Sequence, residues 1–198
     1  MIRAFRLLAR LRRDDSGATL MEFGLIITVF MTLMMGVFDI GHLAYTQSVL
    51  NGAVQTAARS SSLETADTAA ADAKVTELVQ NIAPGSVISA SRVSYYDFND
   101  IDRAESWNDE NGDGDCNDNE NYVDENGNGS WDADIGSSGN GGAGDVVVYE
   151  VTVNYKTLFP NPFLMADFSN RDLKASVIKK NQPFADQTAY GDDAGVCE

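Results

Sequence analysis

The feature that most constrains this chain is an uncharged apolar run near its amino terminus. Residues 23–38 (FGLIITVFMTLMMGVF) carry no charge, and the apolar character extends over residues 20–43. A helix of about 24 residues, rising about 1.5 Å per residue, spans the roughly 30 Å hydrocarbon core of a bilayer. The run therefore predicts a membrane-spanning helix. The alternative is a buried core helix, although a soluble core rarely needs so unbroken an apolar stretch.

Charge is distributed unevenly around this run. Five arginines and no acid precede Asp14, whereas the residues from Ala18 onward carry 9 basic and 28 acidic side chains. Because basic residues stay on the cytoplasmic side, the acidic bulk of the chain is predicted to lie in the periplasm. So acidic a body repels nucleic acid, and we expect no nucleic-acid partner. A cleaved secretory signal is the weaker interpretation, since no small-x-small site follows Phe38.

A single carboxylate, Glu22, lies at the edge of the apolar run. The residues around it, GATLMEFG (residues 17–24), resemble the processing site of type IV pilin-like proteins. In that family a prepilin peptidase cuts on the cytoplasmic side just after the glycine. The resemblance implies a leader of residues 1–17 ending at Gly17 and a mature chain that begins at Ala18. Glu22, followed by Phe23, is then the fifth residue, where the family keeps its glutamate.

The position of Glu22 also has a physical reason. A carboxylate in hydrocarbon costs on the order of 3 kcal/mol at mid-bilayer unless it finds a partner. Cleavage creates an ammonium group at Ala18, one helical turn away on the same face. In a filament of packed helices, Glu22 of one subunit can pair with the Ala18 amine of its neighbour and set their stagger. The alternative is a glutamate that only snorkels to the interface.

Further residues resemble the TadE-type branch of the tight-adherence (Flp, type IVc) pilus systems. They are the runs at residues 21–27, 33–36 and 38–42 and the alanine-rich residues 51–60. The resemblance implies a minor pilin or pseudopilin for surface attachment, with other pilin and Tad secretion-system subunits as partners. It implies a single-pass inner-membrane protein with its carboxyl-terminal domain in the periplasm or in the extracellular pilus. Residues 18–60 form the transmembrane and assembly helix in this interpretation, and residues 61–198 the extracytoplasmic domain.

The fold class expected from the remaining pattern is α+β. A second helix is predicted over residues 64–83, and strands over residues 87–95, 145–155 and 173–179. The plan is a long transmembrane helix continuing into a periplasmic helical region, followed by a small antiparallel sheet with a long acidic loop insertion. No nucleophile–base set or phosphate loop is visible, so we expect no enzyme.

The acidic insertion, residues 97–144, contains a cation-binding pattern. Residues 109–120 (DENGDGDCNDNE) satisfy D-x-[DN]-x-[DN]-G-x5-E at every specified place. We call residues 97–144 the insert and residues 109–120 loop 1. In such loops Ca²⁺ is held by oxygen ligands, and the last glutamate binds with both oxygens. The predicted ligands are Asp109, Asn111, Asp113, Asp115 (through its carbonyl), Asn117 and Glu120.

Residues 124–135 (DENGNGSWDADI), which we call loop 2, repeat the pattern fifteen places later. The predicted ligands here are Asp124, Asn126, Asn128, Ser130 and Asp132. The twelfth place is Ile135, so loop 2 lacks its own glutamate; Asp134 is the candidate substitute, and weaker binding is expected. Without flanking helices, the loops resemble those of dockerin and thrombospondin repeats. The alternative is a solvated acidic loop without metal.

The sequence leaves two further interpretations open. Cys116 and Cys197 both lie on the predicted oxidising side, which permits a disulfide between them, although the sequence does not give their separation. The other function class is an uncleaved single-span membrane protein whose extracytoplasmic domain senses calcium or binds a partner. The state of the amino terminus discriminates between this class and a processed pilin.

Overall fold

The computed structural model describes residues 16–65, 67–158 and 170–197. The helices are α2 (Ser16–Ser60), α3 (Thr68–Gln80) and the 3-10 turn η1 (Phe98–Asp100); the strands are β1 (Val87–Tyr95), β2 (Asn121–Asp124), β3 (Ser137–Ser138), β4 (Val146–Lys156), β5 (Asn170–Lys180) and β6 (Asp193–Val196). This order confirms the predicted α+β class. The chain divides into two compact units, residues 1–44 with 157–170, and residues 45–156 with 171–198. Of the leader predicted for residues 1–17, residues 1–15 lie outside the described residues.

Helix α2 runs uninterrupted for 45 residues because its sequence contains no proline, and its glycines are isolated from one another. Its stretch over Gly17–Ser60 is long and apolar enough to cross a membrane, and none of its most apolar window is buried within the protein. The threonine hydroxyls of this part donate within the helix, from Thr28 to the Gly24 carbonyl (2.8 Å) and from Thr32 to the Thr28 carbonyl (2.9 Å). Polar groups facing lipid are thereby satisfied without an outside partner.

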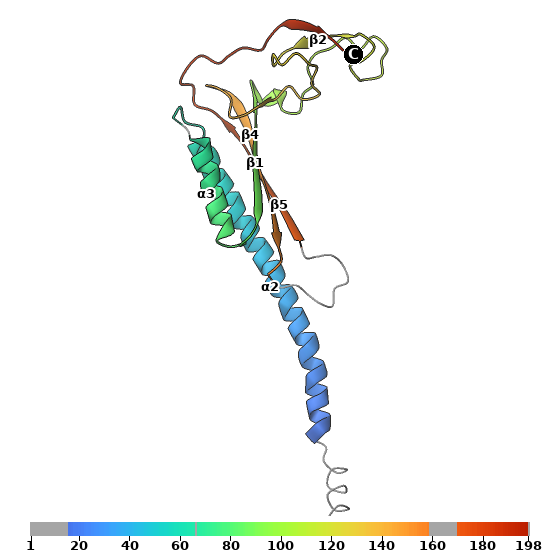
Figure 1. Cartoon of the computed structure of the whole chain (residues 1–198), viewed down its shortest axis with the longest axis vertical. Helices are drawn as coiled ribbons and strands as arrows, with labels where there is room; N and C mark the ends of the chain where they lie inside the picture. The colour runs from blue at the N-terminus through green and yellow to red at the C-terminus, as the bar shows by residue number, and fades with distance from the viewer. Residues whose placement is uncertain (1–15, 66, 159–169, 198) are drawn as a thin grey trace, which may run out of the picture. The chain divides into compact units, whose positions relative to one another are not determined.

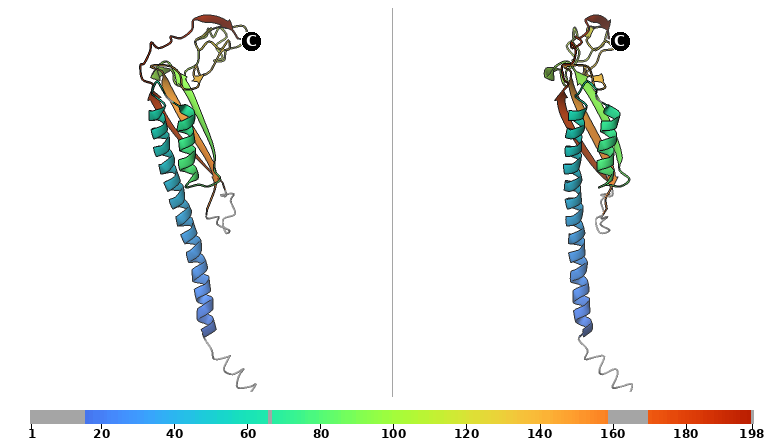
Figure 2. Two further views of the ribbon diagram at one scale, coloured as in Figure 1. Left: turned by 60° about the vertical axis from the view of Figure 1, so that its left-hand side comes forward. Right: turned by 90° about the vertical axis from the view of Figure 1, so that its left-hand side faces the viewer.

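The second unit has its core between two helices and one face of a sheet. The carboxyl-terminal part of α2 and helix α3 run side by side against the strands (Figures 1 and 2). Strand β4 supplies the inward side of this core by alternation, as its sequence predicted. The buried members are Leu50, Ala53, Val54, Ala57 and Ala58 from α2, Ala71, Val75 and Val79 from α3, Ala83 after it, Tyr149, Val151, Val153 and Tyr155 from β4, and Ala175 from β5.

The sheet has the strand order β3-β1-β4-β5, and β1 pairs antiparallel with β4 from Val87 opposite Asn154 to Tyr95 opposite Val146. The insert is therefore the connection of a hairpin, which confirms the predicted place of the acidic segment. The sequence patterns did not predict a second, two-stranded sheet, in which β2 pairs with β6 near the end of the chain.

A charged contact fastens α3 to the sheet. The Arg92 guanidinium on β1 donates to both carboxylate oxygens of Asp72 on α3 (2.8 and 2.6 Å), and the Tyr149 hydroxyl donates to the same carboxylate (2.6 Å). Burial raises the pKa of Asp72, but the hydrogen bonds from Arg92 and Tyr149 outweigh it and hold that pKa below its usual value. The contact is thus an ion pair whose loss leaves Arg92 buried.

Candidate metal centre and processing site

Loop 1 is folded around the carboxylate of its first residue. One oxygen of Asp109 accepts the N–H groups of Gly112 (2.6 Å) and Asp113 (3.2 Å), and the other accepts that of Gly114 (3.1 Å). Gly114 has a φ of 85°, a left-handed conformation that favours glycine. The turn that the motif requires at its sixth place is therefore present.

The side chains at the third, fifth and ninth places of loop 1 converge. The Asn111 amide donates to Asp113 (3.1 Å) and to the Asn117 side-chain oxygen (3.0 Å), and the Asn117 amide donates to Asp113 (2.9 Å). These bonds, chiefly that from Asn117, and the N–H of Asp115 lower the pKa of Asp113. Within the described parts of the chain, no three acidic, histidine or cysteine side chains are gathered closely enough to hold a metal. The amides of Asn111 and Asn117 instead both donate to the Asp113 carboxylate.

The last place of loop 1 lies at its base. Glu120 is buried, and its Oε1 accepts the N–H groups of Glu110 (2.8 Å) and Asn111 (3.3 Å), while its Oε2 accepts that of Asn117 (3.4 Å). These N–H groups belong to the second, third and ninth places of the loop. The carboxylate is therefore oriented by the loop that it closes.

Loop 2 repeats the conformation of loop 1. Asp124 accepts N–H groups from Gly127 (2.7 Å), Asn128 (3.1 Å) and Gly129 (2.7 Å), the same three places that Asp109 binds in loop 1. The Asn126 amide donates to Asp132 (2.7 Å). The N–H of Ser130 donates to Asn128 (2.8 Å), as that of Asp115 donates to Asp113 in loop 1 (2.9 Å). The two loops have one hydrogen-bonding plan.

The carboxylate at the base of loop 2 comes from Glu105, which the sequence reasoning missed. Glu105 is completely buried, and its Oε1 accepts the N–H groups of Glu125 (2.7 Å) and Asn126 (3.2 Å), while its Oε2 accepts that of Asp132 (3.1 Å). Asp134 instead accepts the Tyr95 hydroxyl (2.9 Å). The predicted substitute ligand, Asp134, is thus hydrogen-bonded to β1 in this structure, and its binding of a cation stays a prediction.

A short antiparallel contact joins the segments that precede the two loops. Trp107 and Tyr122 form a β-bridge, flanked by hydrogen bonds from the Asn108 N–H to the Asn121 carbonyl (2.9 Å) and from the Val123 N–H to the Ser106 carbonyl (2.8 Å). In an antiparallel pair, residues equally far before and after the bridge lie opposite each other. Asp109, the first residue of loop 1, therefore lies opposite Glu120. Asp124, the first residue of loop 2, lies opposite Glu105.

The carboxyl-terminal tail is attached to loop 1. Cys116 and Cys197 form a disulfide with Cα atoms 5.6 Å apart. The Cys197 N–H donates to the Glu120 carbonyl and the Asn119 N–H donates to the Cys197 carbonyl (2.9 and 3.1 Å). Together with the pairing of β6 on β2, these contacts hold the tail against the insert.

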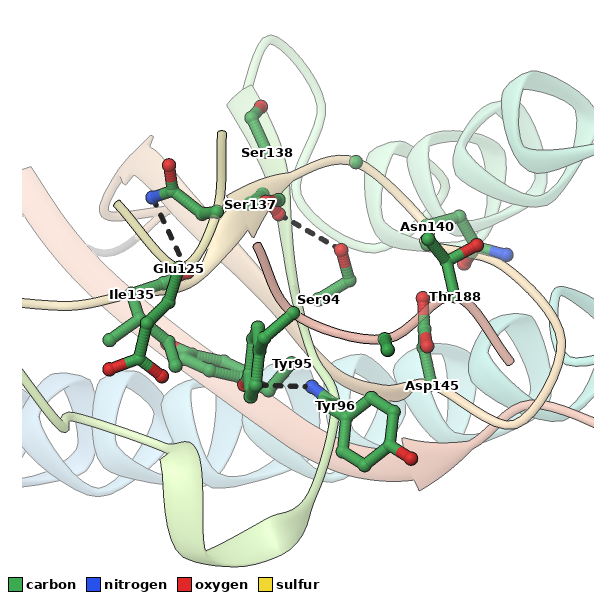
Figure 3. Close-up of a pocket in the computed structure, with 15 residues that line it drawn as sticks. Ser94, Tyr95, Tyr96, Glu125, Ile135, Ser137, Ser138, Asn140, Asp145 and Thr188 are labelled. Carbon is green, nitrogen blue, oxygen red and sulfur yellow. Dashed lines mark hydrogen bonds between the residues drawn. The ribbon is translucent and has the colours of Figure 1, made fainter. Parts of the chain in front are cut away.

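A cavity of about 310 Å³ lies beside loop 2 (Figure 3). Glu125 and Ile135 are on one side of it, and Asn140 and Asp145 are on the other. The Glu125 carboxylate is bound by both terminal nitrogens of Arg103 (2.9 and 2.6 Å), whose hydrogen bonds lower the pKa of Glu125. Asp145 accepts from Gln187 (2.9 Å). Both acids that line the cavity are thus engaged in contacts that hold the insert and tail in place.

The predicted processing residues lie on the first turns of α2. Gly17, Ala18, Glu22 and Phe23 are all exposed, Phe23 to 61%. Ala18 and Glu22 are four residues apart in one helix and therefore share a face. The described residues leave this face free of intramolecular packing near Glu22, as expected of a helix that packs on other subunits or lipid.

Comparison with known proteins gives a family for this helix. Residues 17–59 match the family model of TadE-like proteins. Residues 17–59 are TadE-like. The TadE-like segment begins at Gly17, includes Glu22, and ends one residue before α2 does; it stops short of α3, the sheet and the insert. No curated protein and no solved structure matches the chain. The family match therefore covers helix α2 and does not include the insert.

Proposed function

We propose that this chain is a TadE-like minor pilin or pseudopilin. Prepilin peptidase cuts it after Gly17, and the mature chain is assembled into, or supports, a tight-adherence pilus for surface attachment. The supporting observation is the TadE-like match over residues 17–59, which begins at the glycine of the proposed cleavage site. The chain is anchored in the inner membrane by α2, with its second unit in the periplasm or displayed on the pilus.

The exposed apolar surface of α2 supports assembly through this helix. Leu25, Ile26 and Leu33 are 65–71% exposed, so they need lipid or the helices of other pilin subunits as neighbours. Glu22 lies on the same helix and requires a positive partner wherever water is excluded. The Ala18 amine created by cleavage in a neighbouring subunit supplies that partner.

We further propose that the insert binds Ca²⁺ and is displayed for attachment. The support is the complete motif of loop 1 together with its fold, in which the Asp109 and Glu120 carboxylates accept backbone N–H groups of the loop and Asp113 accepts the amides of Asn111 and Asn117. Carboxylate, amide and backbone oxygens are the ligands that Ca²⁺ prefers. A cation would replace the amide bridges of Asn111 and Asn117 by direct contacts to their oxygens.

The deciding experiment is the intact mass and amino-terminal sequence of the protein purified from its native membranes. A chain that begins at Ala18 supports processing and assembly. A chain that still carries Met1 supports the uncleaved single-span protein with a calcium-dependent sensing domain. Gly17→Leu should abolish cleavage, because a bulky side chain occupies the cut site. Gly24→Leu is the matched control, since a side chain there meets no atom of the protein within 4 Å.

A further inference from the structure

We propose that Glu105 is a metal-ligating residue that closes the second cation site, so that the insert binds a coupled pair of calcium ions. This inference rests on the proposed calcium-binding function. It reverses the expectation from the sequence, in which loop 2 lacks a closing glutamate and binds weakly. The carboxylate of loop 2 is supplied from nineteen residues before Asp124, outside the repeated twelve-residue pattern.

The first argument is the burial of the Glu105 side chain without an ion-pair partner. Glu105 is 0% exposed, and no ion pair among the described residues includes it. Three peptide N–H groups orient its carboxylate but do not neutralise it. A buried carboxylate is retained at low cost only with a positive partner, and a carboxylate keeps about four lone-pair sites, so one remains for a cation.

The second argument is positional equivalence with the complete loop. Glu120 binds the N–H groups of the second and third places of loop 1 through Oε1 and that of the ninth place through Oε2. Glu105 binds the same three places of loop 2 with the same division between its oxygens. Because Glu120 occupies the closing twelfth place of the motif, the same three hydrogen bonds place Glu105 at the closing position of loop 2.

The third argument is how the two glutamates reach their loops. The bridge between Trp107 and Tyr122 pairs their segments antiparallel. Glu105 precedes Trp107 by two residues and so lies beside Asp124, which follows Tyr122 by two. Glu120 and Asp109 are related in the same way. An ion bound by Asp109 fixes the segment that begins with Glu105, and an ion bound by Asp124 fixes the segment that begins with Glu120. Binding at one site therefore positions the glutamate of the other, which makes the two binding events cooperative.

The test is a calcium titration of the full-length protein in detergent, with stoichiometry from equilibrium dialysis and affinity from calorimetry. We expect two ions for the wild type and one for Glu105→Gln, and at least a tenfold weaker affinity for the ion that remains in loop 1. Asp134→Asn is the matched control, because it removes a nearby carboxylate that loop 2 does not use; it should retain both ions.

The possible outcomes distinguish failure of the calcium function from failure of the role of Glu105. A wild-type protein that binds no calcium overturns the calcium function and this inference with it. A wild type that binds one ion, unchanged in Glu105→Gln but lost in Glu120→Gln, leaves the calcium function standing and overturns the role of Glu105. Loss of one ion in Asp134→Asn, with both kept in Glu105→Gln, assigns the ligand to Asp134 instead.

A second variant covers the case in which Glu105→Gln does not fold. Glu105→Asp keeps the negative charge and withdraws the carboxylate by one methylene. If Glu105 is a ligand, one of the two sites should weaken at least tenfold while the other remains occupied. If Glu105 only supports the backbone of loop 2, the aspartate variant should bind both ions with wild-type affinity, which would overturn the inference.

Discussion

The disulfide between Cys116 and Cys197 gives the sharpest prediction for stability. It closes a loop with a sequence separation of 81 residues, which runs through the insert, β4 and β5 before it returns with β6. In the chain-entropy model, closing a loop of that length stabilises the folded protein by about 4.5 kcal/mol at 25 °C, through the unfolded state. We therefore expect the double variant Cys116→Ala/Cys197→Ala to lose about 4 kcal/mol of its free energy of unfolding.

The assay is urea unfolding followed by tryptophan fluorescence. Trp107 and Trp131 suit it, because their rings lie 5.2 Å apart within the insert. With a slope of about 1.5 kcal/mol per molar urea, the midpoint should fall by about 3 M. Reductant should shift the wild type by the same amount and leave the double variant unchanged. Equal midpoints for the wild type and the double variant would refute the reasoning, because the disulfide would then not constrain the part of the chain that unfolds.

Two further predictions concern α3 and the assembly helix. Asp72→Asn should lower the free energy of unfolding by about 2 kcal/mol in the same urea assay, because Arg92 stays buried without its carboxylate partner. The control is Glu77→Gln, which removes an exposed ion pair with Lys74 and should change the free energy of unfolding by less than about 0.5 kcal/mol. Because the pKa of Asp72 is lowered in the folded state, its contribution to the free energy of unfolding should be complete above pH ~4 and lost as the pH falls further. The difference in the free energy of unfolding between wild type and Asp72→Asn should therefore vanish in acid, and a difference that stays constant with pH would contradict this. Glu22→Leu should still be cut at the leader but be missing from sheared pili, and recovery at wild-type levels would disprove the pairing proposal.

Much of the fold was predictable because its signals are local. The uncharged run predicts α2, and the alternation of β4 predicts both its strand and its buried face, which the structure confirms. The pairing of β2 with β6 was not predictable, since both strands are four residues long and lie far apart in the sequence. Short strands carry too few alternating residues for a period to be visible.

Of the two loops of the candidate site, only loop 1 could be predicted completely from the sequence, for a similar reason. Loop 1 carries its whole pattern in twelve consecutive residues, so the sequence names every member. Loop 2 draws Glu105 from an earlier segment, and a motif scan in one window cannot find it. A signal was nevertheless present. Glu105 and Glu120 are spaced as Asp109 and Asp124 are, so the repeat unit begins four residues before each aspartate.

The antiparallel contact at Trp107 and Tyr122 also limits how this insert can evolve. Each unit of fifteen residues provides a glutamate, a strand and a loop, and its glutamate lies at the base of the loop in the other unit. A lone unit would leave one strand edge unpaired and one loop open at its base. A single unit therefore gains nothing until it is duplicated, and inserts of this kind should lengthen across related chains in even multiples of the unit.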